Sequence, residues 1–348
     1  LSGLVGSEMC IRDRFILYIN DICNITNQGK FVLFADDTNI FIAADTKDEA
    51  FIMANQVLQD VSRYMEVNLL HINVKKCCYM YFSPSKRKKS EPDNHIEDQI
   101  LYINGRVIQR VQQTKFLGVI IDDKLSWGPH ISSLNQKLRS ICGRIHRIRK
   151  CLPESLYEQL YHSLFESHLG FAISVWGGVP DTQLQSLFVT QKKCIRILFG
   201  DYKSYVDKFE TCARSRPIHS QCMGSSFYKK ESTKPLFTKH ELLTVQNLYR
   251  YRCILEFFKI MKYRMPVSLY ELFVRSDRKE TYMITPRPTH QFVYNSAWQW
   301  NEFRKIIGLL DFSSPITSIK NLLMKSLRTT QVLRGNEWCN LNFSGYCV

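Results

Sequence analysis

The chain has 348 residues, 45% of them hydrophobic, and a formal net charge of +15 at pH 7. This length and apolar content can fill the cores of two or three domains, which excludes a disordered chain. The excess of positive charge favours a polyanionic partner, which is either nucleic acid or an anionic membrane face. The longest apolar run, GFAISVWGGV, is too short to span a membrane, so nucleic acid is the favoured partner and no membrane is expected.

The twelve cysteines are not spaced as a disulfide framework or as zinc ligands. There is no C-x-x-C pair, and the adjacent Cys77 and Cys78 lie in an apolar run that suits buried free thiols. Cys212, His219 and Cys222 offer three zinc ligands without a clear fourth at finger spacing. Scattered free thiols are typical of a reducing compartment, so we expect the protein in the nucleus and cytoplasm.

Residues 1–14, LSGLVGSEMCIRDR, differ in character from everything that follows. They lack the basic start and the long apolar centre of a signal peptide. The segment resembles a translated sequencing adapter, a common contaminant of assembled transcripts, so we interpret it as non-native. We therefore expect the natural protein to be longer, with the native part of this chain starting at Phe15.

Up to about Asp123 the pattern is that of strands with interspersed helices, which predicts an α+β fold. FILYINDICNI has helical character, and FVLF and TNIFIA predict the two strands of a β-hairpin. Thr46 and Glu49 form a capping box at the start of a helix. CCYMYF and TKFLGVIID predict further strands, and Asn104-Gly105 between them predicts a type I′ hairpin. The residues expected to be buried on the capped helix follow helical spacing: Ala50, Met53, Ala54, Val57, Leu58, Val61 and Met65.

After Trp127 the chain is predicted to be helical. A second helix is expected from Pro153 to about His168, and a third over 181–200, with Gly200 as its C-cap. The first and longest helix is indicated by apolar residues at alternating steps of three and four: Ile131, Leu134, Leu138, Ile141, Ile145 and Ile148.

The last third of the chain has a weaker pattern. No periodicity stands out between about Cys212 and Lys234, and we interpret 212–238 as a linker. Residues 239–265 and 314–329 are predicted to be helical, the latter with Ser314 as N-cap and Pro315 at the first helical position. We therefore expect a helical C-terminal region over 239–348.

Two adjacent carboxylates, Asp36 and Asp37, lie between the strands of the first hairpin. One interpretation is a solvated turn, because aspartate is a favoured turn residue. The other is a cation site: the flanking strands are apolar almost without alternation, so we expect the hairpin to be covered on both faces. Like charges there need a neutralising cation, and oxygen ligands of this kind suit Mg²⁺. This gives half of a two-metal phosphoryl-transfer site, which needs a further carboxylate from another strand.

Five segments, in order, resemble one protein family. LYINDI, FADDTNIF, LHINVKKCCYMYFS, KFLGVIIDDKLSW and SLFESHLGFAISVWGG are similar in identity, order and spacing to the reverse transcriptase of a jockey-like non-LTR retrotransposon. The likeness extends from about Phe15 to the C-terminus and includes the late segment SAWQWNEF. It implies a partial palm of antiparallel sheet and packed helices over 15–127, and a helical thumb over 128–211.

The implied activity is RNA-directed DNA synthesis primed by a nicked target. Its partners are an RNA template and a DNA primer, its substrates are deoxynucleoside triphosphates, and its cofactor is Mg²⁺. The resemblance makes Asp36 the direct Mg²⁺ ligand and Asp37 its supporting neighbour. Lys76 corresponds to a lysine that assists the incoming triphosphate as an acid toward pyrophosphate; a surface lysine beside a strand is the alternative.

Phe116, Leu117 and Gly118 correspond to the strand that grips the primer end, where glycine lets backbone approach backbone. Leu117 suits a core position equally well. The family's other metal-binding aspartate, its fingers and its endonuclease precede LYINDI and are not in this sequence. With carboxylates from one strand only, we predict that this chain as given cannot polymerise DNA.

The first predicted helix after Trp127 has a basic flank beside its apolar residues. The alternative to a nucleic-acid contact is a solvated face on an ordinary amphipathic helix. The run Lys86-Arg87-Lys88-Lys89 suits phosphate binding or nuclear localisation, and also a solubilising loop. The basic flank of this helix includes Arg149, and five of its residues are expected to contact phosphates: Lys137, Arg139, Arg144, Arg147 and Lys150.

Two rival functions remain for the chain: a nucleic-acid-binding remnant of a decayed element, and a structural or host-recruited protein.

Overall fold

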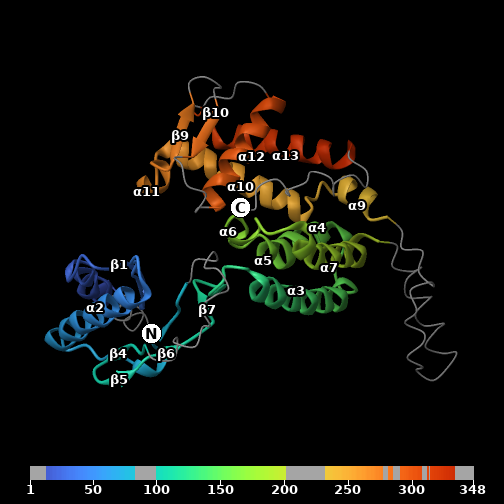
Figure 1. Cartoon of the computed structure of the whole chain (residues 1–348). Helices are drawn as coiled ribbons and strands as arrows, with labels where there is room; N and C mark the ends of the chain where they lie inside the picture. The colour runs from blue at the N-terminus through green and yellow to red at the C-terminus, as the bar shows by residue number, and fades with distance from the viewer. Residues whose placement is uncertain are drawn as a thin grey trace, which may run out of the picture. The chain divides into compact units, whose positions relative to one another are not determined.

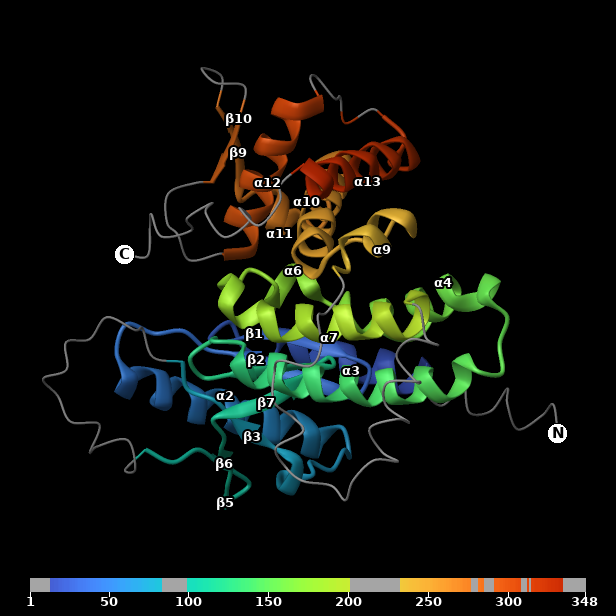
Figure 2. The same ribbon diagram turned by 90° about the vertical axis from the view of Figure 1, so that its right-hand side faces the viewer.

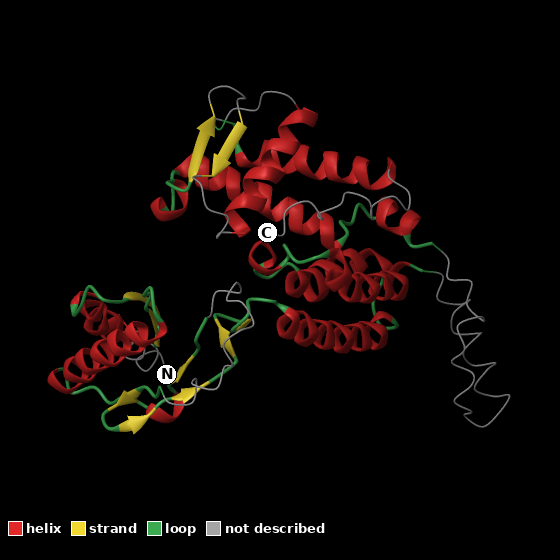
Figure 3. Cartoon of the chain, viewed as in Figure 1, coloured by secondary structure: helices red, strands yellow, loops and turns green. Residues whose placement is uncertain are grey.

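The computed structural model describes residues 13–82, 99–200, 232–276, 281–284, 291–307, 312 and 314–333. Several sequence-based interpretations lie outside these residues: the basic run at 86–89, the zinc candidates Cys212, His219 and Cys222, most of the proposed linker, and residues 1–12. The described part is a mixed α+β fold, mostly helical, with small two-stranded sheets (Figure 3). The chain divides into unit 1 (Leu1–Phe116 and Ile121–Leu125) and unit 2 (Leu117–Ile120 and Ser126–Val348).

Unit 1 combines one long helix with short strands (Figure 1). Its elements are a helical segment at 13–19, η1 (Asn20–Asn24), β1 (Lys30–Phe34), β2 (Asp37–Phe41), α2 (Lys47–Val67), η2 (Val74–Lys76), β3 (Cys78–Tyr79), β4 (Tyr102–Ile103), β5 (Arg106–Val107), β6 (Gln109–Arg110) and β7 (Gln113–Phe116). The hairpins β1–β2 and β4–β5 are both confirmed, and β3 pairs in parallel with β6. Asn104 and Gly105 have φ of +48° and +70°, as a type I′ turn requires.

The core of unit 1 lies between α2 and the elements on either side of it in the sequence. Thr46 caps α2 as predicted, because its side-chain oxygen accepts a hydrogen bond from the Glu49 N–H at 3.2 Å. Of the residues predicted to be buried, Ala50, Met53, Leu58 and Met65 are only half-buried. The buried cluster is Ile19, Ile22, Phe51, Ala54, Val57, Val61, Leu101, Ile103 and Ile108.

The prediction of two buried thiols in unit 1 is wrong. Cys77 is half-buried and Cys78 is exposed. Cys77 is extended and leads directly into β3, which begins at Cys78. Successive side chains along an extended segment point to opposite faces, so the two thiols cannot both face the core.

The described part of unit 2 is mainly helical. Its helices are α3 (Gly128–Arg149), η4 (Glu154–Leu156), α4 (Tyr157–Leu160), the π-helical η5 (Tyr161–Glu166), α5 (Ser167–Leu169), α6 (Ile173–Trp176), α7 (Asp181–Phe199), α9 (Lys234–Lys239), α10 (Val245–Tyr263), α11 (Val267–Tyr270), α12 (Gln291–Ile307) and α13 (Ile316–Leu333). β8 (Val119–Asp122), which begins in unit 2 and ends in unit 1, precedes them, and β9 (Phe273–Ser276) pairs with β10 (Thr281–Ile284). That last hairpin lies within the region predicted to be helical and was not expected from the sequence.

The main core of unit 2 lies where α3 and α7 run side by side (Figure 2). The predicted apolar residues of α3 are buried, except that Ile148 near its end is 41% exposed. Buried Gln191 on α7 ties neighbouring elements together: its Nε2 donates to the Tyr161 hydroxyl and to the Leu243 carbonyl, both at 2.8 Å. Its Oε1 accepts from the Val245 N–H at 3.0 Å. These bonds fix α7 against η5 and the start of α10.

Gly177 allows an especially close packing of α6 against α10. A Cβ at this position would lie 2.5 Å from the Ile173 carbonyl oxygen and 2.6 Å from Cδ2 of Tyr249. Only a residue without a Cβ therefore fits. By contrast, a Cβ at Gly143, on α3, would meet nothing within 4 Å.

A second cluster in unit 2 gathers around the fully buried Trp300 of α12. Phe257 and Phe258 of α10 approach its ring, with centroid distances of 5.4 and 5.9 Å. Helices in the described ranges lack the length and apolar character needed to cross a membrane.

Candidate metal-binding hairpin and nucleic-acid interface

The paired aspartates lie at the tip of the β1–β2 hairpin, as predicted. Phe34 pairs with Asp37 in the register, which leaves Ala35 and Asp36 as the two-residue turn. Ala35 has φ of +52°, in the left-handed region that two-residue hairpin turns use. Asp37 is therefore the first residue of β2 rather than part of the turn, and both carboxylates are exposed.

Within the described part of unit 1 the hairpin packs through one face, whereas the sequence predicted cover on both. Phe31, Leu33 and Ile40 pack against the core of unit 1. Residues on the other face alternate with them, and there Phe34 is 59% exposed and Phe41 is 50% exposed. Asp37 lies on this open face, because it pairs across the hairpin with Phe34.

The two carboxylates fit a hard divalent cation that is shared with a substrate. Mg²⁺ typically keeps several waters and uses one or two protein carboxylates together with substrate phosphates. The described part of the chain has no group of three or more His, Cys, Asp or Glu residues that could hold a metal ion. The hairpin therefore offers an open pair of ligands and not a closed cage.

Lys76 is the last residue of the short helix η2 and is exposed. Its backbone N–H donates to the Asn73 carbonyl at 2.9 Å, which holds the turn in shape. Among the described residues, no hydrogen bond or ion pair connects its ammonium group to Asp36 or Asp37. Its predicted role with the triphosphate stays a prediction.

The predicted primer-grip residues do not form one continuous strand. The strand expected over TKFLGVIID is wrong, because the chain reverses between β7 and β8. Leu117 and Gly118 have φ of +45° and +89°, and two positive φ values in succession give a tight hairpin turn. Phe116 ends β7, so the three residues lie at a hairpin tip.

Gly118 allows a close approach, but to an aromatic ring and not to backbone. A Cβ there would lie 3.1 and 3.3 Å from Cε1 and Cζ of Phe171. Phe171 is 52% exposed, and its carbonyl accepts a hydrogen bond from Nε1 of Trp176 at 2.9 Å. Sequence reasoning did not select Phe171, although it stands inside SLFESHLGFAISVWGG; a large aromatic residue after Gly170 was the available signal.

The basic flank of α3 is exposed at every position predicted to contact phosphate: Lys137, Arg139, Arg144, Arg147 and Lys150. No Asp or Glu occurs between Asp123 and Glu154, so the flank has no acidic neighbour along its own helix. Arg149 is the exception to the predicted pattern. It is buried, donates from Nη2 to the Gly200 carbonyl at 3.5 Å, and lies 5.3 Å from the Tyr157 ring.

Two histidines respond to the positive field of α3. Burial lowers the pKa of His168, and the nearby charges of Lys137 and Arg144 lower it further. Burial also lowers the pKa of His146, with a further contribution from Lys150. The exposed cations of α3 that contribute to these shifts form a surface that attracts anions.

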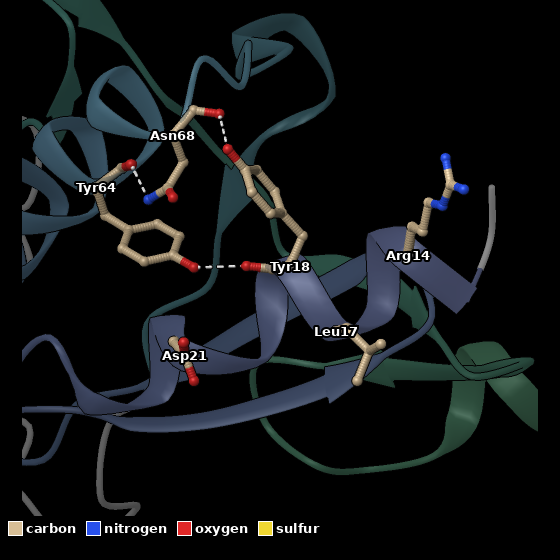
Figure 4. Close-up of a pocket in the computed structure, with 6 residues that line it drawn as sticks. All are labelled: Arg14, Leu17, Tyr18, Asp21, Tyr64 and Asn68. Carbon is tan, nitrogen blue, oxygen red and sulfur yellow. Dashed lines mark hydrogen bonds between the residues drawn. The ribbon is translucent and has the colours of Figure 1, made fainter. Parts of the chain in front are cut away.

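A hollow of about 510 Å³ lies on unit 1, outside the predicted site (Figure 4). Tyr18 donates through its hydroxyl to the Asn68 carbonyl at 2.9 Å, and Tyr64 donates to the Tyr18 carbonyl at 2.8 Å. Burial and, less strongly, the Asp21 carboxylate raise the pKa of Tyr64. The rim includes Arg14, a residue of the adapter-like segment, so we assign no function to this hollow.

Comparison with known proteins relates the N-terminal part of the chain to one family. Residues 14–121 match the family described as reverse transcriptase (RNA-dependent DNA polymerase). This range contains Asp36, Asp37, Lys76 and the turn at 117–118. The N-terminal region therefore carries a reverse transcriptase domain.

Two curated relatives show which reverse transcriptases the chain resembles. The RNA-directed DNA polymerase from mobile element jockey of Drosophila melanogaster is 26% identical over 174 residues, which are 48% of this chain and 18% of that protein. The protein of the same description from Drosophila funebris is 28% identical over 175 residues, with the same two shares. This chain is therefore a distant homologue of the jockey polymerase over part of its length, and it spans 18% of each relative. No solved structure matches it.

Proposed function

We propose that this chain supplies the metal-binding hairpin, the primer-end turn and the thumb of a jockey-like reverse transcriptase acting in target-primed reverse transcription. The observation that carries the proposal is the pair Asp36-Asp37, at the tip of a tight hairpin inside the range that matches the reverse transcriptase family. The exposed cations of α3 support it, because a polymerase must hold a polyanionic duplex.

Each residue has a separate task in this proposal. Asp36 is the direct Mg²⁺ ligand, and Asp37 lies beside it on the open face of the hairpin. With Mg²⁺ held there and by further ligands, the site would gain activation of the primer hydroxyl and stabilisation of the leaving pyrophosphate. Lys76 donates a proton toward that pyrophosphate, and residues 116–118 hold the primer end. Most of the catalysis is positioning and electrostatic stabilisation, as in phosphoryl transfer generally.

We further propose that the 348-residue chain alone is catalytically incomplete. The described residues bring no third acidic ligand to Asp36 and Asp37, and a two-metal site needs one. The test is primer extension on an RNA template by the purified chain, with Asp36→Ala as the control. We expect no extension by either protein. Extension by the wild-type chain that is lost in Asp36→Ala would refute the incompleteness and support the catalytic role.

A second experiment tests the hairpin without relying on activity. Mn²⁺, a paramagnetic substitute for Mg²⁺, should broaden the backbone NMR signals of residues 34–39 selectively. Asp36→Asn should abolish this broadening, whereas Asp45→Asn, in the exposed segment after the same hairpin, should leave it intact. Uniform broadening, or broadening insensitive to Asp36→Asn, would contradict a metal site at the hairpin tip.

The second candidate function is a nucleic-acid-binding remnant without catalysis. The open metal-ligand pair and the exposed basic face of α3 together favour it. Both candidate functions predict duplex binding, and only recovery of polymerase activity with a longer chain separates them.

All cysteines in the described part are free thiols, which supports the proposed reducing compartment. The division into palm, thumb, linker and C-terminal region stays a proposal.

A further inference from the structure

The turn at Leu117-Gly118 continues into a surface that no comparison assigns. Phe171 packs one part of its ring against Gly118, which has no side chain to displace it. The rest of the ring stays accessible, since the residue is 52% exposed. The backbone of Phe171 is held on both sides, by the hydrogen bond from Trp176 and by its own N–H, which donates to the His168 carbonyl at 3.4 Å. The ring is thus an exposed, firmly positioned aromatic group.

Cations of two helices in unit 2, α3 and α10, lie near the segment that carries this ring. His168, three residues earlier, lies on α5, which packs against α3, and the charges of Lys137 and Arg144 on α3 act on it. Arg252 of α10 places its guanidinium 3.9 Å from the position that a Cβ on Gly170 would take. Lys137, Arg144 and Arg252 are all exposed. An aromatic ring among cations is the arrangement that binds single-stranded nucleic acid, where the ring stacks on a base and the cations hold phosphates.

We propose that Phe171 stacks on an unpaired base at the junction of a nucleic-acid duplex and its single-stranded overhang, with Lys137, Arg144 and Arg252 holding the adjacent phosphates. This contact rests on the proposed function and adds to it a means of recognising the end of the duplex. A blunt duplex offers no unstacked base to the ring, so the contribution of Phe171 is specific to a junction. The cations act on both kinds of end.

The test compares two fluorescent probes by anisotropy: a template–primer duplex with a single-stranded template overhang, and the same duplex with blunt ends. Phe171→Leu keeps an apolar group against Gly118 but removes the stacking face. We expect it to weaken binding of the overhang probe by about 5- to 150-fold and to leave the blunt probe and the salt dependence unchanged. Phe171→Trp should retain the preference for the overhang. Tyr263→Leu, at an aromatic residue of α10 that is 55% exposed, is the matched control and should change neither affinity.

Other results of the two-probe comparison would contradict the stacking role of Phe171. An equal loss on both probes, or no loss on either, would overturn the stacking role while leaving the basic surface in place. If the wild-type chain binds neither probe, the proposed function itself fails. If Phe171→Leu unfolds in a thermal melt, Phe171→Trp decides: a folded Trp variant without preference for the overhang would refute the inference.

Discussion

The basic face of α3 makes a quantitative prediction about salt. Five cations are exposed there: Lys137, Arg139, Arg144, Arg147 and Lys150. Each phosphate that is neutralised on B-DNA contributes about −0.9 to the slope of log affinity against log salt. If each cation neutralises one phosphate, the slope is about −4.5, and raising salt from about 50 to about 200 mM weakens binding about 500-fold.

Removing three of these charges should flatten the slope in proportion. In the triple variant Arg144→Gln, Arg147→Gln, Lys150→Gln the slope falls to about −1.8, and the same rise in salt weakens binding only about 12-fold. The assay is anisotropy of a labelled duplex, titrated at a series of salt concentrations. The substitutions lie on the exposed flank, so the core between α3 and α7 should be unaffected.

A matched control separates the local effect from the loss of net charge. Lys234, Lys239 and Lys320 are exposed on α9 and α13, and their triple change to Gln lowers the formal charge by the same amount. We expect this control to keep the steep slope of the wild type. Equal slopes in all three proteins, or equal flattening in both variants, would refute α3 as the phosphate-binding surface.

Three further predictions concern stability, and those on unit 2 can be followed by tryptophan fluorescence, since all five tryptophans lie there. Gly177→Ala should cost about 1–3 kcal/mol through overpacking, whereas Gly143→Ala, in open space, should stabilise α3 by up to about 1 kcal/mol; equal melting temperatures would contradict this. His130 is buried with its pKa lowered by burial, and its Nδ1 accepts the Ile120 N–H at 3.3 Å. Its neutral form therefore contributes stability that is complete above pH 6.5 and is lost as pH falls through the folded pKa, so His130→Gln should make the melting temperature of unit 2 less sensitive to pH in that range. Thr46→Ala should cost about 1 kcal/mol, seen as faster hydrogen exchange at the start of α2; unchanged exchange would argue against the cap.

Much of the fold could be predicted because the decisive signals are local. Asn104-Gly105 specifies its own turn, Thr46 caps its own helix, and the apolar spacing of α3 defines its buried face. Leu117 shows the limit of such signals. It adopts a positive φ, which a leucine in an apolar run does not indicate, and so the sequence favoured one strand where the chain makes a hairpin.

The residues of the candidate site were predicted in part from the sequence, but their surroundings were not. Asp36 and Asp37 were found because two carboxylates between apolar strands stand out, but the covering of each strand face depends on partners far away in the sequence. Phe34 and Phe41 are apolar and nevertheless exposed. Phe171 was missed because its contact with Gly118 joins residues that are distant in the sequence, and no periodic pattern records such a contact.

The π-helical segment η5 determines which side of the helix the buried residues on it and after it face. Tyr161, Phe165 and Leu169 are spaced by four and all fully buried. In an α-helix each step of four overshoots a full turn by about 40°, so three such residues would drift around the axis. A π-helix needs more than four residues per turn, and within η5 a step of four falls short of a turn instead. The step from Tyr161 to Phe165 within η5 falls short of a turn, and the step from Phe165 to Leu169, mostly in α5, overshoots it. These two rotations offset each other, so the three side chains can face the same core. Deleting a single residue from 161–166 would remove this correction and rotate everything after it, including the loop that presents Phe171.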